Sequence, residues 1–417
     1  MLKIISKSGS FLSCALHMYE NGEKLKVYID EEPARGLYKG LLPKASDIAA
    51  LDISPKDIVI IDMVGFGDGA NVLKQKGITV IGAGKLADKM ELDRNYGLNL
   101  MNQSGIKMPP GKSFNSFQDA AAFVSKTKKR YVFKPNGNLS TSLTYVSTST
   151  VNLLAMFPYL EKQCKGKADF ELQEFIPGIE MSTEAWFNGE RFVFPINSTM
   201  EEKKLFPGNS GPNTGCMGNV VWFWDSETSN ILYEKMFKAL EPGLKKDKYV
   251  GPIDINAIWA EDGIYGLEYT ARFGYDAIQA FDQLLTVPME IFLKSLKGIK
   301  ELPVEPEKYA VAIRVSIPPY PHSTENVPEI PILGITKNIK RNLYLSDIKL
   351  EEGNLCTGGY DGDVLTIADS GNNLKKITSH LYGIIDILEI PNKQYRNDIG
   401  DRVPVEKSQI EKYLKKL

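Results

Sequence analysis

Histidine and cysteine are both scarce in this chain. Its 417 residues include only three histidines and four cysteines. The cysteines form no C-x-x-C pair and lie far apart, at Cys14, Cys164, Cys216 and Cys356. This spacing implies neither a zinc site nor a disulfide framework. We therefore expect reduced thiols in a cytoplasmic protein.

An excess of charge of either sign and long apolar runs are also missing. Lys and Arg number 50 against 52 for Asp and Glu, so the basic surface typical of nucleic-acid-binding proteins is not expected. No run approaches the roughly 18 apolar residues of a membrane span. The first apolar stretch is short and leads into the strand-like "KLKVYID", so we expect no signal peptide. The expected partners are small molecules, with no nucleic acid and no membrane.

The length predicts two to four structural units, because a single core stops growing at about 250 to 300 residues. Strands and helices alternate over residues 1–85, which is typical of a small parallel α/β unit. A single helix is expected over residues 88–105, before the Pro109-Pro110 pair. We predict a multidomain α/β and α+β protein with four units: an α/β domain at 1–105, a small module at 106–180, a larger module at 181–300 and a strand-rich domain at 301–417.

A lysine ends one of the predicted strands of the small module. Lys134 lies where "YVFKP" enters the Gly- and hydroxyl-rich "NGNLSTS" loop, and an ammonium beside free backbone amides suits a phosphate. The alternative is an ordinary strand end before a hairpin. The G-x-x-x-x-G-K-[ST] spacing of a P-loop is absent.

A second polar group surrounds the Pro177-Gly178 turn. Gln173, Glu174 and Glu180 offer amide and carboxylate groups at a strand exit. Such groups can hydrogen-bond an adenine edge and ribose hydroxyls, but the same pattern also fits a polar hairpin corner.

Two strands joined by a short hairpin carry a third polar group. Strand alternation puts Asp254 and Asn256 on one face, and Glu268, Thr270 and Arg272 on one face of the next strand. Oxygen ligands beside an arginine suit Mg²⁺ with bound phosphates, since Mg²⁺ takes few protein carboxylates. A salt-bridged solvent face is the alternative.

The segment "GPNTGCMG" at 211–218 is rich in glycine. Its glycines permit positive φ and a close approach of backbone amides to a ligand, and Asn213 and Thr214 add side-chain hydrogen bonds. Loops of this kind often carry function, although a mobile connector has a similar composition.

The order of these motifs resembles the ATP-grasp superfamily, and the motifs are most similar to those of the phosphoribosylamine–glycine ligase family. That family typically shows GPNTGGMG, EFNARFGDPE and YRRDIG. This chain has "GPNTGCMG" at 211–218, "EYTARFGYDAIQ" at 268–279 and "YRNDIG" at 395–400, so the resemblance spans nearly its whole length. It implies an ATP-grasp fold with an N-terminal parallel α/β pre-domain and a C-terminal strand-rich domain.

The resemblance also assigns roles to individual residues. It implies that Arg94 and Lys134 contact phosphates, that Glu174, with Gln173 beside it, lies at the adenine hinge, and that Glu180 contacts the ribose. It also implies that Glu268 is a magnesium ligand and that Arg272 lies beside the reacting carboxylate and phosphate. Lys203 matches the lysine of the family's D-H-K-R stretch, and Asn213 and Thr214 match the substrate-covering loop.

The activity that the resemblance implies is an ATP-dependent ligation. ATP phosphorylates a carboxylate such as glycine, and an amine such as phosphoribosylamine attacks the acyl phosphate, in purine biosynthesis. The implied cofactors are ATP and Mg²⁺ (or Mn²⁺), and the implied state is a monomer. Such chemistry needs charge neutralisation and positioning rather than a Ser-His-Asp triad.

The chain departs from the family pattern at several motifs. Thr270 replaces the usual metal-binding asparagine, for which Asp254 or Asn256 on the neighbouring strand is expected to compensate, and "STSLT" at 140–144 replaces a glycine-rich phosphate lid. On the amine side, family motifs are replaced by "KSGSFLSCA" at 7–15, "DMVGFG" at 62–67 and "PPYP" at 318–321. Two alternatives therefore stay open: a related ligase that uses another amine, and a nucleotide-binding protein without turnover.

Overall fold

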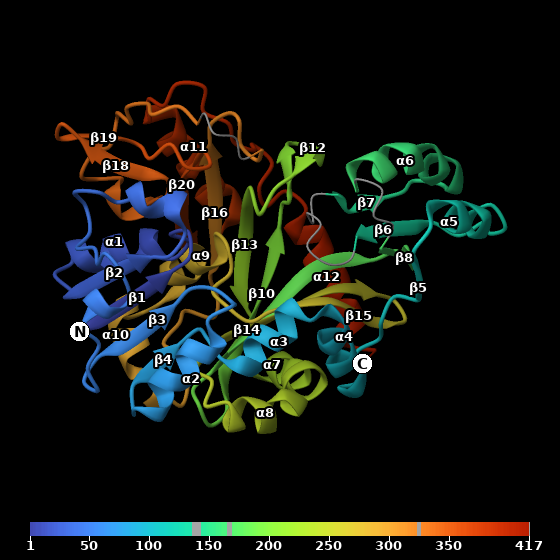
Figure 1. Ribbon diagram of the computed structural model, residues 1–417, viewed down its shortest axis with the longest axis horizontal. Helices are drawn as coiled ribbons and strands as arrows, with labels where there is room; N and C mark the ends of the chain where they lie inside the picture. Colours follow the sequence, from blue (N-terminus) through green and yellow to red (C-terminus); the bar gives the residue numbers. More distant parts are fainter. Residues whose placement is uncertain (136–142, 165–168, 323–326, 417) are drawn as a thin grey trace.

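The computed structural model describes residues 1–135, 143–164, 169–322 and 327–416 (Figure 1). Its N-terminal unit contains a four-stranded sheet of order β2-β1-β3-β4 in which every pair is parallel. The elements are β1 Leu2–Ser6, α1 Leu12–Glu20, β2 Leu25–Ile29, β3 Ile58–Ile61, α2 Gly67–Gln75 and β4 Thr79–Ile81. The predicted parallel α/β unit is confirmed. The loops after β1 and β3 leave neighbouring strands at the same edge of the sheet, where ligands bind in such folds.

The prediction of a single helix over residues 88–105 is wrong. Two helices, α3 Lys85–Leu92 and α4 Arg94–Gln103, are separated at Asp93. The Oδ1 atom of Asp93 accepts a hydrogen bond from the backbone N–H of Tyr96 at 3.0 Å, so this residue caps α4. The cap places Arg94 in the first turn of a new helix.

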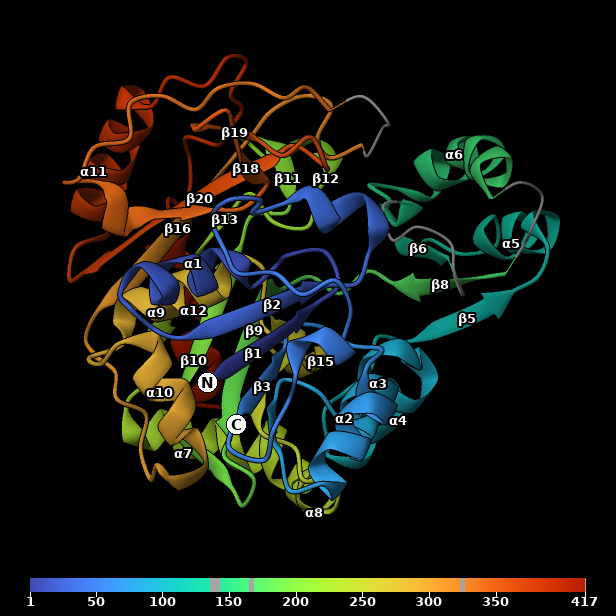
Figure 2. The same cartoon turned by 60° about the vertical axis from the view of Figure 1, so that its left-hand side comes forward.

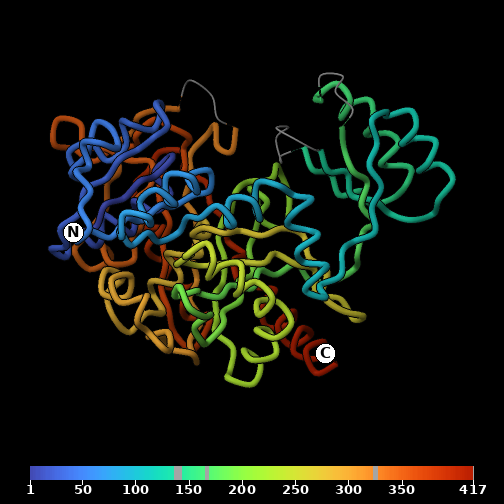
Figure 3. The backbone as a smooth tube through the Cα atoms, turned by 60° about the horizontal axis from the view of Figure 1, so that its bottom comes forward, coloured from blue at the N-terminus to red at the C-terminus, as the bar shows by residue number. Residues whose placement is uncertain are grey.

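A separate lobe follows, which projects from the rest of the molecule (Figure 3). Its antiparallel sheet has the order β5-β8-β6-β7. The elements are β5 Gly111–Phe114, α5 Phe117–Val124, β6 Tyr131–Pro135, β7 Tyr145–Val146, α6 Thr150–Gln163 and β8 Phe170–Glu174. The lobe has its own hydrophobic core, in which the ring centre of Phe117 lies 4.6 Å from that of Phe170 and 5.9 Å from that of Phe133.

An eight-stranded sheet forms the centre of the molecule, with the order β15-β14-β9-β10-β13-β16-β20-β17 and antiparallel pairing throughout. Its strands are β9 Ile179–Phe187, β10 Phe192–Glu201, β13 Gly218–Phe223, β14 Gly251–Ala260, β15 Gly263–Thr270, β16 Tyr309–Ser316, β17 Leu343–Leu345 and β20 Asp363–Gly371. The C-terminal region is rich in strands, as expected. Strands from both sides of residue 300 share this one sheet, because β13 pairs with β16.

Smaller elements surround the central sheet. Two hairpins are formed by β11 Lys204–Phe206 with β12 Ser210–Asn213 and by β18 Ile348–Glu351 with β19 Asn354–Thr357. The helices are α7 Ser226–Leu232, α8 Glu241–Lys246, α9 Ala277–Leu284, α10 Met289–Ser295, α11 Leu374–Ile387 and α12 Val403–Leu414. Figure 2 shows β11 and β12 beside the C-terminal region, on the side that faces the small lobe.

The strand register collects polar side chains on one face of the central sheet. Asp254 pairs with Glu184 on one side and Thr270 on the other, and Asn256 pairs in the same way with Ser182 and Glu268. Because side chains alternate between faces, these residues share a face. This polar face forms one wall of the candidate site.

Candidate active site

Two cations meet at the junction between the small lobe and the N-terminal unit. Lys134, in β6, is half-buried, and Arg94 is in the first turn of α4. Burial and then the charge of Arg94 lower the pKa of Lys134 to about 8, against the opposing charges of Glu268, Glu171 and Glu180. Arg94 Nε and Nη2 are buried without a hydrogen-bond partner in the described structure. A buried guanidinium beside a second cation is matched to an anionic ligand such as a phosphate.

The β8 strand directs the two predicted hinge residues to opposite faces. Gln173 shares a face with Glu171, to which its Nε2 donates at 3.0 Å, and Glu171 pairs with Lys134 in the register. Glu174 faces the other way, and its Oε1 lies 2.5 Å from Lys129 Nζ. The side chain of Gln173 is therefore on the face of Lys134, and that of Glu174 is not.

The predicted phosphate-covering loop falls mainly outside the described residues. Of "STSLT" at 140–144, only Leu143 and Thr144 are described. Its replacement of a glycine-rich lid therefore stays a sequence-based prediction.

Lys203 lies between two carboxylates of neighbouring strands of the central sheet, Glu180 in β9 and Glu201 in β10. Its Nζ lies 2.8 Å from Glu180 Oε1 and 3.7 Å from Glu201 Oε2. Burial opposes the charge of Lys203, but Glu180, Glu201 and Glu268 outweigh it and raise its pKa. Asn256 Nδ2 also donates to Glu180 at 3.2 Å. The predicted ribose glutamate and the predicted lysine thus contact one another directly.

The three predicted metal ligands differ in their readiness to bind a cation. Burial, and then the charges of Glu184 and Glu201, raise the pKa of Asp254 well above its ordinary value. A carboxyl group must be deprotonated to bind a metal ion, and the raised pKa of Asp254 favours its protonated form. A nearby cation would be needed to stabilise the deprotonated form. Glu268 is exposed, and Thr270 lies opposite Asp254. In the described part of the chain no three His, Cys, Asp or Glu side chains group as a metal site.

Arg272 follows β15 and reaches back to the N-terminal unit. Its Nε lies 2.8 Å from Oε1 of Glu91, at the end of α3, and its guanidinium carbon lies 4.9 Å from the ring centre of Tyr275. The other oxygen of Glu91 accepts the backbone N–H of Ala271 at 2.8 Å. Burial disfavours the charged form, but Glu91, Tyr275 and Glu268 raise the pKa of Arg272 above its ordinary value. This arginine is therefore held, charged, beside Glu268.

The "GPNTGCMG" segment contributes β12 to the hairpin β11–β12, which we call the covering hairpin (residues 204–213). Asn213 pairs with Lys204 across it. The backbone N–H and Oγ1 of Thr214 both donate to the carbonyl of Lys203, at 2.7 and 2.9 Å. The segment is thus anchored to the backbone that carries Lys203, rather than being a slack connector.

Two residues of the "YRNDIG" motif, Arg396 and Asp398, bind the covering hairpin. Arg396 donates to both oxygens of Asp398 at 2.7 Å and to Lys204 O and Asn209 Oδ1 at 3.1 Å. Asp398 Oδ2 accepts the backbone N–H of Gly208 at 2.9 Å. Glu202 lies 3.2 Å from Arg396 and 2.6 Å from Arg402. We call Arg396, Asp398, Glu202 and Arg402 the C-terminal clamp.

A buried carboxylate lies in "DMVGFG" at 62–67, one of the segments that replace family motifs on the predicted amine side. Asp62 follows β3, is 2% exposed, and accepts hydrogen bonds through Oδ2 from Ser6 Oγ at 2.6 Å and from the Phe11 N–H at 3.0 Å. Its Oδ1 is buried without a partner in the described structure. Phe11 stacks on Phe273, with ring centres 4.7 Å apart, which brings this turn against the segment of Arg272.

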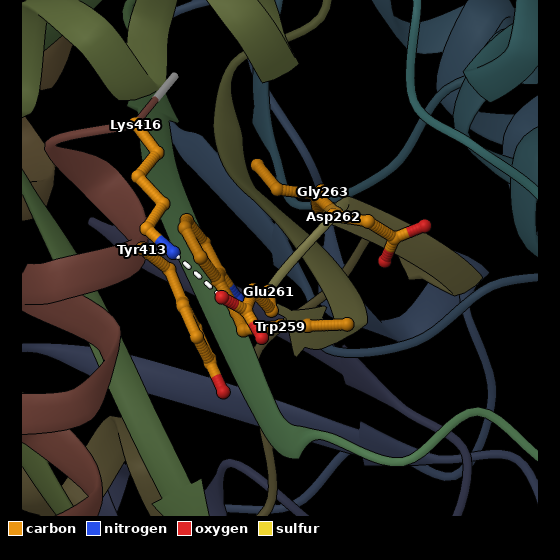
Figure 4. A pocket seen from close by; sticks show the side chains of 8 residues that line it. Trp259, Glu261, Asp262, Gly263, Tyr413 and Lys416 are labelled. Carbon is orange, nitrogen blue, oxygen red and sulfur yellow. Dashed lines mark hydrogen bonds and ion pairs between the residues drawn. The ribbon is translucent and has the colours of Figure 1, made fainter.

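Figure 4 shows a hollow elsewhere, between the β14–β15 turn and the end of α12. It measures about 90 Å³ and is closed on one side by the ion pair of Lys416 Nζ with Glu261 Oε1, 2.8 Å apart. Ligand pockets usually measure about 300 to 1,000 Å³. None of the predicted site residues lines it.

Across the described ranges, no helix has the length and apolar character to cross a bilayer.

Sequence reasoning missed four residues that complete the site. Glu171 could have been found from strand alternation, since it is two residues before Gln173. Glu91 lies three residues before Arg94, at the end of the preceding helix. Glu201 lies two positions before its partner Lys203, so it could have been found from their spacing. Arg396 gave no local signal of its contacts with the covering hairpin, because Lys204 and Asn209 lie close to 190 positions away in the chain.

Comparisons with known proteins show which proteins this chain resembles. The protein-family model described as "Phosphoribosylglycinamide synthetase, ATP-grasp (A) domain" matches residues 92–277. The phosphoribosylamine–glycine ligase of Halalkalibacterium halodurans is 25% identical over 344 residues, which cover 80% of this chain and 79% of that protein. The range that the family model matches, residues 92–277, contains every predicted site residue.

Solved structures share the fold. The phosphoribosylamine–glycine ligase of Thermotoga maritima has a TM-score of 0.74 at 22% identity and covers 96% of this chain and 100% of its own. The biotin carboxylase domain of the Hydrogenobacter thermophilus 2-oxoglutarate carboxylase, solved with MgADP and bicarbonate, has a TM-score of 0.60 at 10% identity and covers 98% and 93%. The fold is therefore that of ATP-grasp proteins, and the chain is similar in sequence to phosphoribosylamine–glycine ligases.

Proposed function

We propose that the protein is an ATP-dependent carboxylate–amine ligase that forms an amide through an acyl phosphate. The observation that carries this proposal is the set of cations in the site. Arg94 Nε and Nη2 are buried without a partner in the described structure, Lys203 is held 2.8 Å from Glu180, and Arg272 is held 2.8 Å from Glu91. Cations drawn from different parts of the chain suit a phosphoryl transfer, in which the charge spreads over outer oxygens.

Each residue has a physical task in this reaction. Lys134 and Arg94 hold the phosphates of ATP, and Gln173 and Glu180 border the nucleotide. Arg272, fixed by Glu91, holds the reacting carboxylate beside the transferred phosphoryl group. The covering hairpin shields the acyl phosphate from water until the amine attacks the acyl carbon and inorganic phosphate leaves.

Mg²⁺ fits this donor set. Glu268 is the exposed carboxylate that would hold it, with Thr270 and Asp254 next to it, and the remaining positions are left for phosphate oxygens. When bound, the ion would neutralise the phosphate charge during transfer. The deprotonation of Asp254 that binding requires is opposed by burial and by Glu184.

Phosphoribosylamine and glycine are the substrate pair that we propose, from the names of the relatives. A second candidate is a ligase for another amine, which is favoured by Asp62 at the amine side, where the family motif is replaced. Cytoplasmic location and a monomeric state are further predictions from the family resemblance.

The test is to incubate the protein with ATP, Mg²⁺ and a panel of carboxylates and amines, and to follow ADP release and product mass. ADP release that depends on both glycine and phosphoribosylamine supports the first pair. ADP release only with other amines supports the second candidate. An absence of ADP with every combination contradicts the ligase proposal and leaves a nucleotide-binding protein.

A further inference from the structure

The C-terminal clamp contains the most deeply buried arginine of the described chain. Arg396 is 1% exposed, and Glu202, one of its partners, is 5% exposed. Arg402 contributes a second cation, which donates to the backbone carbonyl of Glu201 at 2.7 Å. Buried charges persist only when they are paired and fully hydrogen-bonded. The clamp satisfies this condition by joining the C-terminal segment to the end of β10 and to the covering hairpin.

The covering hairpin depends on these contacts for its position. A two-stranded hairpin is marginal by itself in water, and the residues around the turn, Phe206 and Gly208 to Gly211, are exposed. Arg396 and Asp398 bind its first strand through Lys204 and its turn through Gly208 and Asn209.

The clamp also determines where Lys203 points. Glu202 directs its carboxylate to Arg396 and Arg402, while the next residue, Lys203, directs its ammonium to Glu180. Thr214 holds the carbonyl of Lys203 from the other end of the hairpin. A shift of Glu202 would therefore move both Lys203 and the hairpin.

We propose that Arg396 is a positioning residue whose clamp keeps the covering hairpin over the acyl phosphate, so that the amine and not water receives the acyl group. This inference rests on the proposed ligase function. In the reaction that the clamp suppresses, water attacks the acyl phosphate, the bond between the acyl group and the phosphate breaks, and the carboxylate and inorganic phosphate are released with a proton. The net result is hydrolysis of ATP to ADP and phosphate without an amide.

The test uses hydroxylamine as the amine, so that the natural acceptor need not be known. The full-length protein receives ATP, Mg²⁺, glycine and hydroxylamine, and ADP and glycine hydroxamate are measured. The variants are Arg396→Lys, which keeps the charge but loses the paired bonds to Asp398, and Asn209→Gly, which removes one acceptor from the exposed turn. Glycine tolerates the positive φ of +54° at position 209.

Matched controls repeat each change away from the hairpin. Arg341→Lys alters an exposed arginine, and Asn392→Gly alters an exposed asparagine with a φ of +60°. Binding of a non-hydrolysable ATP analogue and the thermal unfolding midpoint are measured for every variant. The positioning role predicts unchanged analogue binding in the hairpin variants, because the clamp does not contact the cations of the phosphate site.

We expect ADP released per hydroxamate formed to rise about 2- to 10-fold in Asn209→Gly, the effect of one lost hydrogen bond. In Arg396→Lys hydroxamate formation falls roughly 10- to 100-fold while ADP release continues. A wild-type ratio in folded Arg396→Lys, or in Asn209→Gly if the first variant does not fold, overturns the inference. If the wild-type protein releases no ADP with any carboxylate and amine, the ligase function itself fails, which is a separate outcome.

Discussion

Replacing Arg94 by methionine tests whether the cation pair is built for a phosphate. Methionine keeps most of the length and the apolar stem of arginine but has no guanidinium. In the ligand-free protein, Arg94 Nε and Nη2 are buried without a partner among the described residues. A buried polar group without a partner costs about 1 to 3 kcal/mol. Because Arg94→Met removes this cost, we expect it to leave the free energy of unfolding unchanged or to increase it. Most point substitutions instead lower the free energy of unfolding by about 1 kcal/mol.

The same substitution removes charge-assisted hydrogen bonds to the ligand. Each such bond contributes about 1.5 to 3 kcal/mol, which corresponds to a roughly 10- to 150-fold loss of affinity for ATP. The pKa of Lys134 is also expected to rise, because the charge of Arg94 lowers it in the native protein.

The assay combines calorimetric titration of a non-hydrolysable ATP analogue with thermal unfolding of the ligand-free protein. Arg94→Met is expected to weaken the analogue while the unfolding midpoint stays equal or rises. Arg341→Met, at an exposed arginine of the C-terminal region, is the control for both measurements. A clear loss of ligand-free stability in Arg94→Met would show that the guanidinium has a structural role, and unchanged affinity would remove it from the phosphate site.

Three further predictions follow from the same site. Since the pKa of Lys134 is about 8, binding of an ATP analogue at pH 8 should take up protons and weaken as the pH rises to 9; calorimetry in buffers of different ionisation enthalpy measures the uptake, and Lys134→Met should abolish it. Burial raises the pKa of Glu184 from 4.5 to about 7, so its contribution favours folding below pH 4.5 and is lost as the pH rises through 7; Glu184→Gln should increase stability at pH 8 by up to about 3 kcal/mol in denaturant unfolding, and an equal gain at pH 4 would contradict this reasoning. Arg272→Lys keeps the charge but loses the Nε hydrogen bond to Glu91, and we expect kcat to fall about 100-fold with little change in analogue affinity; steady-state kinetics that show only a higher KM for ATP would contradict the assigned role.

The residues proposed to bind phosphate could be picked out from the sequence because their signals are local. Lys134 ends a strand before a glycine-rich loop, and strand alternation placed Asp254 and Asn256 on one face, as the register confirms. The helix boundary was missed because Asp93 reads as one more helical residue until its cap to Tyr96 is seen. Local capping therefore decided the position of Arg94.

The long-range part of the site could not be predicted. Arg396 gave no sign of its distant partners, since Glu202 and Asn209 lie close to 190 positions earlier in the chain. The sequence motif "YRNDIG" indicated a family likeness but not a task. Only the folded structure joins it to the covering hairpin.

The continuous central sheet limits how such a chain can be divided during evolution. Removal of the residues beyond 300 would strip β16 from β13 and leave a long, unpaired strand edge, which favours aggregation. The small lobe at 111–174 has a core of its own and can be exchanged without opening another sheet. New specificities in proteins of this architecture are therefore more accessible by replacing loops or that lobe than by gaining or losing the C-terminal region.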